Sequence, residues 1–355
     1  MTKLTALIAC LAVLALVPAG ADAQTFTPLP ASQFKLIKHG FDKAARQRIS
    51  QLATKYPQVG LDRLLADTNR VNTGPRPDLT PRGAFGYSWE NGDDDVSYWT
   101  PQGITGNGAG VQAVSWYRGS SGSEEGVRIS FVNRSEGAYG EYRFGLLVRP
   151  TGGTGFAQVP IHAGGIAWAD RFLYVADTNI GVRVFNLNRV LRVRNRDLDD
   201  TGDYRYLIPQ IGHYQRNGNF KYSALGLDNS IAGKPALVAG EYQVYENDDP
   251  VTRIARWRIG AKSSMLTRPA ASGAWRTGFD QLQGVLTNNG RIFVSSTEGP
   301  RGFLYHGRPG RKAQRDRWGA GPEGLYATNT QLWSLTEHQD ARTVFGKTFR
   351  SLLDD

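Results

Sequence analysis

The stretch that decides the fold runs from His162 to Phe185 and has three parts. It reads His162-Ala-Gly-Gly-Ile-Ala-Trp168, then Leu173-Tyr-Val-Ala-Asp-Thr178, then Gly181-Val-Arg-Val-Phe185. A glycine step precedes a short apolar strand that ends in polar groups, and a turn and a second strand follow. Short β-branched and aromatic runs bounded by Gly, Asn and Asp are typical of antiparallel strands.

This pattern recurs along the chain at intervals of about 40 to 60 residues, the length of a four-stranded propeller blade. The copies begin at Gly103, Gly165, Gly226, Gly284 and Gly324. We therefore predict an all-β fold, a β-propeller with five visible repeats and five to seven blades; two β-sandwiches are the alternative. Tyr87-Ser-Trp89 and Tyr98-Trp99 are predicted to complete a blade with the strand near residues 342–345, which closes the ring.

The chain before residue 83 has a different texture. Apolar residues recur every three or four positions between about 32 and 72, which predicts helix. The first of them are Phe34, Ile37, Phe41, Ala45, Ile49 and Leu52. A Pro-rich connector, residues 73–81, follows. We therefore divide the chain into a helical segment with its connector, residues 24–82, and a propeller domain, residues 83–355.

The N-terminus has the pattern of a signal peptide. Lys3 precedes an apolar run over residues 4–17, and Ala21-Asp22-Ala23 is a small-residue cleavage site. We expect cleavage after Ala23 and a protein secreted to the periplasm or the exterior. The one cysteine, Cys10, leaves with residues 1–23. The mature chain then has no disulfide, so its own core must stabilise it, and we expect a monomer.

The formal net charge of +10 indicates an acidic partner. The basic residues are scattered and form no nucleic-acid-binding motif, so we expect an anionic surface or an anionic polymer as the partner and no nucleic acid. No later apolar stretch is long enough for membrane insertion. Asp197-Leu-Asp-Asp-Thr-Gly-Asp203 has the acidic spacing of a calcium loop but lacks the terminal Glu of an EF-hand. We predict a solvated turn and no cofactor, with a structural calcium ion as the alternative.

The inner strands of a propeller place their ends around a common axis, so equivalent positions of the repeats converge in space. Polar residues at these strand ends are therefore candidates for a site, and a hydrogen bond between blades is the alternative role for each. This set comprises Tyr117, Arg118, Asp177, Glu241, Tyr242, Glu298, Glu337 and His338. A second ring precedes the glycines and comprises Gln102, His162, Gln283 and Glu323.

Two histidines are candidates for an acid or base. His162 lies in Val159-Pro-Ile-His-Ala-Gly-Gly165, where the glycines allow a ligand to approach closely. A structural histidine that anchors a turn is the alternative. His213, in Ile211-Gly-His-Tyr214, is the second candidate.

The segments quoted at the start resemble a family of secreted actinobacterial-type β-propeller proteins of unassigned function. Pro101-Gln-Gly103, Gly240-Glu-Tyr242 and Leu332-Trp-Ser-Leu-Thr-Glu-His338 fit the same family. The resemblance covers most of the chain after residue 83, and it implies the propeller fold and export but no activity.

The chain also resembles, more weakly, propeller polysaccharide lyases of the ulvan lyase and rhamnose–glucuronate lyase type. Those enzymes use a His, a Tyr and an Arg in a central cleft. Tyr242 and Arg258 have the spacing of that Tyr and Arg, and His162 lies upstream. The second His of those families falls near Arg183, which is a departure from their pattern.

This second resemblance implies cleavage of an anionic, uronic-acid-containing polysaccharide by β-elimination. His162 and Tyr242 are then the acid/base pair, and Arg258 neutralises the carboxylate beside the proton that is removed. A positive cleft would attract the polyanion. The predicted substrate-binding residues are Arg183, Gln102, Gln283, Tyr117, Arg118, His213, Glu298 and His338.

Two alternatives stay open from the sequence. A glycoside hydrolase would use two carboxylates about 5 to 9.5 Å apart. The candidates for that pair are Asp177, Glu241, Glu298 and Glu337. A non-catalytic carbohydrate-binding or adhesion propeller would bind the polymer without turnover.

Overall fold

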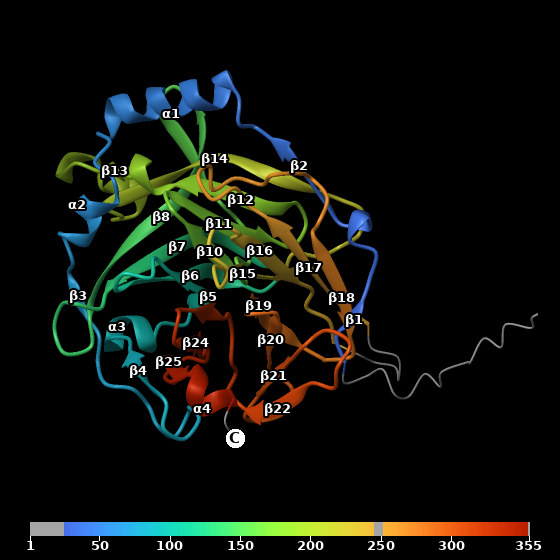
Figure 1. Cartoon of the computed structure of the whole chain (residues 1–355). Helices are drawn as coiled ribbons and strands as arrows, with labels where there is room; N and C mark the ends of the chain where they lie inside the picture. Colours follow the sequence, from blue (N-terminus) through green and yellow to red (C-terminus); the bar gives the residue numbers. More distant parts are fainter. Residues whose placement is uncertain (1–24, 245–250, 354–355) are drawn as a thin grey trace, which may run out of the picture.

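The computed structural model describes residues 25–244 and 251–353 (Figure 1). The predicted signal peptide and Cys10 lie outside the described residues. Strands make up most of the ordered elements, and the few helices are short. Within the described residues, no helix has the length and apolar character needed to cross a membrane.

Units of four antiparallel strands follow one another in sequence around a common centre, and the outer strands of the first two units also pair with each other in parallel, which joins those units into one sheet (Figure 1). Blade 1 contains β5 (Trp99–Gly106), β6 (Val111–Ser120), β7 (Ser123–Asn133) and β8 (Glu141–Gly152). Blade 2 contains β10 (Ile166–Ala169), β11 (Phe172–Asp177), β12 (Gly181–Asn186) and β14 (Tyr206–Asn217). Blade 3 contains β15 (Ala224–Asp228), β16 (Ala236–Gly240), β17 (Thr252–Arg258) and β18 (Gly273–Thr277).

The last two units have the same order of strands. Blade 4 contains β19 (Leu282–Asn288), β20 (Arg291–Ser296), β21 (Phe303–Gly307) and β22 (Gln314–Arg317). Blade 5 contains β23 (Tyr326–Ala327), β24 (Gln331–Leu335), β25 (Thr343–Thr348) and, outermost, β4 (Phe85–Ser88). The innermost strand of each blade contacts that of the next, and β23 contacts β5. The predicted mostly-β fold is confirmed, and within the described residues this topology is that of a five-bladed propeller.

The glycines that revealed the repeat lie where neighbouring inner strands touch. A Cβ added to Gly165 would lie 1.9 Å from the backbone nitrogen of Leu225 in the next blade. One added to Gly324 would lie 2.9 Å from Cα of Gly103, which joins the last blade to the first. The backbones around the axis are therefore packed too closely for any side chain at these positions.

The N-terminal part of the propeller completes its last blade. Thr343 pairs with Ser88 and Val344 pairs with Tyr87, so β4 is hydrogen-bonded to β25 as the sequence predicts. Trp99 does not join this pairing, because it is the first residue of β5 in blade 1. Closure by a strand from the other end of the domain ties the two ends of the ring together.

The helical period predicted over residues 32–72 is realised only in part. Helix is present in α1 (Lys43–Lys55) and α2 (Leu61–Leu65), whereas β2 (Lys35–His39) is a strand paired with β14. Gly40, with a φ of +74°, ends that strand, and the Asp42 side chain then caps α1 by accepting a hydrogen bond from the Ala45 N–H. The apolar residues before Gly40 therefore cover the outer edge of blade 2.

The remaining elements are short and peripheral. They are β1 (Thr27–Pro28), β3 (Arg70–Val71), β9 (Gly155–Gln158), β13 (Leu191–Arg192), α3 (Asn91–Asp94), α4 (Phe349–Leu353) and the 3-10 turns Ala31–Gln33, Leu187–Arg189, Asn195–Asp197 and Asp199–Thr201. Strand β1 extends blade 3 and β3 extends blade 1. Residues 25–82 thus add edge strands to several blades, and α1 and α2 pack on the outside of blades 1 and 2.

Candidate active site

A pocket of about 650 Å³ lies where the inner strands begin and the second strands end. We call it the axial pocket. Its larger polar side chains include Gln102, Tyr117, Glu124, His162, Asp177, Arg183, Lys221, Tyr242, Gln283 and Glu337. The volume falls in the range of ligand pockets. The structure thus brings together many of the residues that the repeat predicts to converge.

Two β-bulges aim amide side chains at this pocket. The register of β5 against β6 shifts between Pro101 and Ile104, and that of β19 against β20 shifts between Leu282 and Gly284. A bulge turns a side chain out of the regular alternation of a strand. Gln102 and Gln283 lie in these bulges and line the pocket, whereas the glycines after them pack at the axis.

His162 is held by two neighbours from blade 1. Its Nδ1 lies 3.0 Å from Oε1 of Glu124, and its ring stacks on Tyr117 with ring centroids 4.4 Å apart. Burial acts to raise the pKa of Glu124, but the backbone N–H groups of Gly122 and Glu124 and the His162 side chain together hold that pKa below its ordinary value. Glu124 therefore stays ionised down to acidic pH.

Two further carboxyl groups, those of Glu337 and Glu323, belong to blade 5. Glu337 lines the pocket, and its Oε2 accepts a hydrogen bond of 2.7 Å from the side-chain amide of Gln102. Glu323 is fully buried, and neither of its carboxyl oxygens has a hydrogen-bond partner among the described residues. Burial, and then the charge of Glu337, raise the pKa of Glu323 well above its ordinary value. Glu323 thus keeps its proton at pH values where an exposed Glu has lost it.

Two tyrosines complete this set. Burial, followed by smaller contributions from nearby acidic groups, raises the pKa of Tyr242. Burial likewise raises the pKa of Tyr117, opposed by a hydrogen bond with Thr100. Tyr117 and Tyr242 both line the axial pocket, and the acidic group of Glu337, which lines it too, acts in the same direction as burial on both pKa values.

Other predicted carboxylates are occupied by arginines of their own blade. Oδ2 of Asp177 lies 2.8 Å from Nε of Arg183, and its Oδ1 accepts backbone N–H groups of the following turn. Glu241 is buried and forms two hydrogen bonds, of 2.6 and 2.7 Å, with the Arg253 guanidinium. These pairs hold turns within blades 2 and 3, and Arg183 faces the pocket already bound to a carboxylate.

Arg258 does not join His162 and Tyr242. In the antiparallel pair of β16 and β17, Gly240 lies opposite Ile254 while Arg258 lies opposite Ala236. Tyr242 follows the end of β16, so Arg258 lies at the other end of the blade. The prediction that these three residues share a cleft is therefore wrong in its placement of Arg258.

Four more predicted residues lie outside the axial pocket. Arg118 forms an ion pair with Glu125, and Glu298 accepts a hydrogen bond of 2.6 Å from the Tyr305 hydroxyl. His213 of β14 lies opposite Arg183 of β12, and its ring stacks on that of His39 in β2 with ring centroids 5.5 Å apart. His338 is exposed in the turn after β24. Arg118, Glu298 and His213 thus contact structural neighbours away from the pocket.

The charge of the axial pocket differs from the expected positive cleft. Glu124, Asp177 and Glu337 line it together with Arg183 and Lys221. Because Arg183 is paired with Asp177, the lining carries no excess of cations. The acidic segment 197–203 lies elsewhere and folds largely into 3-10 turns. Among the described residues, no group of three or more His, Cys, Asp or Glu side chains is arranged to hold a metal ion.

Comparisons with known proteins give a distant similarity of shape alone. No family model matches the sequence, and no curated protein matches it. Among solved structures, the GH43_1 enzyme from Xanthomonas citri complexed with xylotriose is 11% identical, with 86% of this chain and 92% of that chain covered and a TM-score of 0.39. The β-xylosidase RS223 is 11% identical, with 71% and 92% covered and a TM-score of 0.39. A glucose dehydrogenase is 12% identical, with 67% and 78% covered and a TM-score of 0.36.

Proposed function

We propose that this protein is a carbohydrate-active propeller that hydrolyses a glycosidic bond in the axial pocket. The observation that carries the proposal is a set of carboxyl groups whose pKa values are displaced in opposite directions. The pKa of Glu124 lies below its ordinary value, and that of Glu323, beside Glu337, lies well above it. Displaced pairs of this kind allow one group to act as acid while another acts as base.

The roles follow from which groups reach the pocket. Glu337 lines it and is the acid that delivers a proton to the leaving oxygen. Glu323 is buried, has no hydrogen-bond partner among the described residues and interacts with Glu337 only through charge, so it is a positioning residue that hands no proton on directly. Glu124, ionised and fixed by His162, acts on the anomeric side, either by attacking the sugar carbon or by activating water.

The rest of the lining suits a sugar. Tyr117 and Tyr242 offer partly apolar rings, and Gln102 and Gln283 offer amide groups. Sugar rings present apolar faces and many hydroxyl groups, so rings and planar amides together complement them. The β-elimination hypothesis has less support, because Arg258 lies away from the pocket and Arg183 is already paired with Asp177.

The test is hydrolysis of a panel of neutral and acidic oligosaccharides, with products followed by reducing-end assay and by NMR of the anomeric carbon. We expect saturated products, with E337Q and E124Q each lowering kcat by about 100-fold or more. The matched control is E136Q, which removes an exposed carboxylate outside the pocket. Retention or inversion at the anomeric carbon then shows whether Glu124 attacks directly or through water.

Three outcomes would contradict this proposal. Unsaturated products would restore the β-elimination hypothesis. Saturable binding with no product from any substrate would favour the non-catalytic propeller. Full activity in both E337Q and E124Q would remove these carboxylates from the mechanism.

A further inference from the structure

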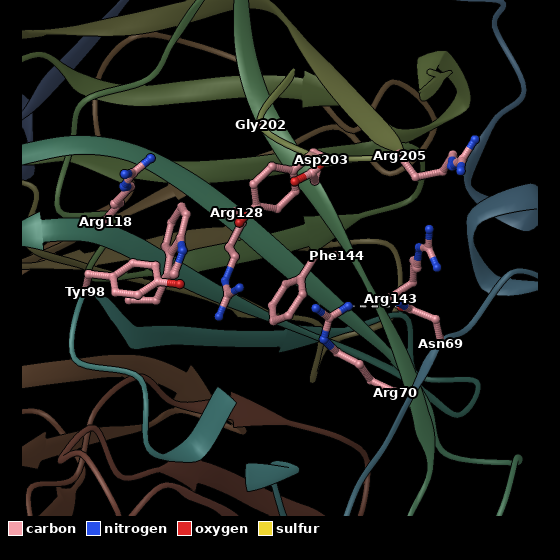
Figure 2. Close-up of a pocket in the computed structure, with 12 residues that line it drawn as sticks. Asn69, Arg70, Tyr98, Arg118, Arg128, Arg143, Phe144, Gly202, Asp203 and Arg205 are labelled. Atoms are coloured by element: carbon pink, nitrogen blue, oxygen red, sulfur yellow. Dashed lines mark hydrogen bonds between the residues drawn. The ribbon is translucent and has the colours of Figure 1, made fainter. Parts of the chain in front are cut away.

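A second cavity, of about 460 Å³, lies on blade 1 and contains an unusual number of arginines (Figure 2). We call it the arginine cavity. The arginines in its lining are Arg70, Arg118, Arg128, Arg143 and Arg205. Asp203 is the one carboxylate in the lining among the described residues. The aromatic members are Tyr98, Trp99, Phe144 and Tyr204.

Carboxylates that do not line the cavity neutralise part of this charge. Asp93 is buried and receives Arg128 at 2.9 Å and Arg70 at 2.9 Å, while Arg118 is paired with Glu125 at 3.1 Å. These contacts fix the guanidinium groups without using all five N–H donors of each. Figure 2 shows Arg70 and Arg128 on either side of the Phe144 ring, with guanidinium carbons 5.0 and 3.7 Å from its centroid.

Arg143 and Arg205 are not neutralised in this way. Among the described residues, neither has a carboxylate at ion-pair distance; Arg205 donates to the Val193 carbonyl and to Asn195, and Arg143 lies over the Tyr206 ring. Burial lowers the pKa of Arg143, and the charges of Arg70 and Arg205 act in the same direction against Asp67 and Tyr206. A half-buried cation that has cationic neighbours and no carboxylate at ion-pair distance is stabilised when an anion enters.

We propose that the arginine cavity binds an oxyanion carried on a sugar ring, either a sulfate ester or a carboxylate. Guanidinium groups present paired N–H donors that match the oxygens of both anions. Tyr98, which is 57% exposed beside Arg118, offers a ring on which a sugar can stack. This site is distinct from the axial pocket, and its test does not depend on the proposed hydrolysis.

Blade 1 itself separates the two sites. Tyr117 lines the axial pocket and the next residue, Arg118, lines the arginine cavity. Consecutive residues of a strand point to opposite faces of its sheet. An oligosaccharide at the arginine cavity is therefore held against the other face of the strand that forms one wall of the axial pocket.

The experiment is titration calorimetry with full-length mature protein and four probes. These are maltohexaose, the same oligosaccharide fully sulfated, an oligogalacturonate and a single-stranded DNA oligonucleotide. We expect binding of the sulfated probe, the uronate probe or both, and none of neutral maltohexaose. The comparison of the two acidic saccharides shows whether the anion is sulfate or carboxylate.

Variants test the location of binding. R143Q and R205Q should each weaken binding of the acidic saccharide by about 10- to 100-fold, the usual effect of losing a charged hydrogen bond. R149Q is the matched control, because Arg149 is exposed on the same strand as Arg143 but outside the cavity. Equal affinities of R143Q, R205Q and R149Q would overturn the assignment. So would an absence of binding by both acidic saccharides, or tighter binding of the DNA than of either.

Discussion

The carboxyl group of Glu323 is buried and has no hydrogen-bond partner among the described residues. We therefore predict how the free energy of unfolding depends on pH, with no substrate needed for the test. The folded-state pKa of Glu323 lies well above the ordinary value of 4.5 because of burial and then the charge of Glu337. For a group with a raised folded pKa, stability is fully present below pH 4.5 and is lost as the pH rises towards the folded pKa. E323Q has no ionisable group at this position and should not show that loss.

The size of the effect follows from linkage. One proton held by the folded chain and released on unfolding changes the free energy of unfolding by at most about 1.4 kcal/mol per pH unit. The difference between E323Q and the wild type should therefore be nearly constant below pH 4.5. It should then grow in favour of E323Q with that limiting slope until the folded pKa is reached.

The assay is urea unfolding followed by tryptophan fluorescence from about pH 2 to pH 9, a range that includes the acidic values below 4.5 at which the Glu124 contribution is lost. E124Q is the control with the opposite sign. The folded pKa of Glu124 is lowered, so the wild type gains stability over E124Q as the pH rises and loses that gain as the pH falls. Parallel curves for E323Q and the wild type across this range would refute the claim that Glu323 is protonated in the folded protein.

Three further predictions follow from the fold. G165A should lower the free energy of unfolding by about 3 kcal/mol or more, because the added Cβ meets the Leu225 backbone. The control G92A, where the added Cβ lies in open space, should change it by less than about 1 kcal/mol. Equal urea midpoints of the two variants would contradict the close packing of the inner strands. R253Q removes the cation paired with the buried Glu241 and should lower the free energy of unfolding by about 3 to 5 kcal/mol. A urea midpoint equal to that of the exposed-site variant R149Q would contradict this. R258Q should leave kcat/KM unchanged, and a large fall would return Arg258 to the site.

The repeat predicted the fold because it records a packing constraint that only glycine satisfies. Close approach of inner strands at Gly165 and Gly324 excludes a Cβ, so the constraint is visible in the sequence itself. The N-terminal strand β2 left no comparable signal. Ile37 and Phe41 fit a helical spacing, and only pairing with β14, which is distant in sequence, decides that residues 35–39 are extended.

The candidate site could be predicted only in part. Convergence of the strand ends explains why Gln102, His162 and Tyr242 meet, since equivalent positions of the repeats share one face. Arg258 was misplaced because antiparallel neighbours end at opposite edges of a sheet, so strand-end positions in β16 and β17 cannot meet. Glu124 is near the start of β7 and matches no ring position; its acidic side chain beside the Gly-rich turn before β7 was the available signal.

The formal net charge of the chain is +10, and its cations are distributed unequally between the two cavities. A basic protein was expected to have a basic cleft at its axis, but the axial pocket balances Glu124, Asp177 and Glu337 against two cations. Acid/base chemistry at carboxyl groups favours such a balance, because a strongly positive pocket would lower the pKa of the group that must keep its proton. The arginine cavity, by contrast, has five arginines to one aspartate in its lining. The proposed anion site and the proposed carboxyl chemistry thus lie on opposite faces of blade 1, where the cations of one do not lower the pKa values of the other.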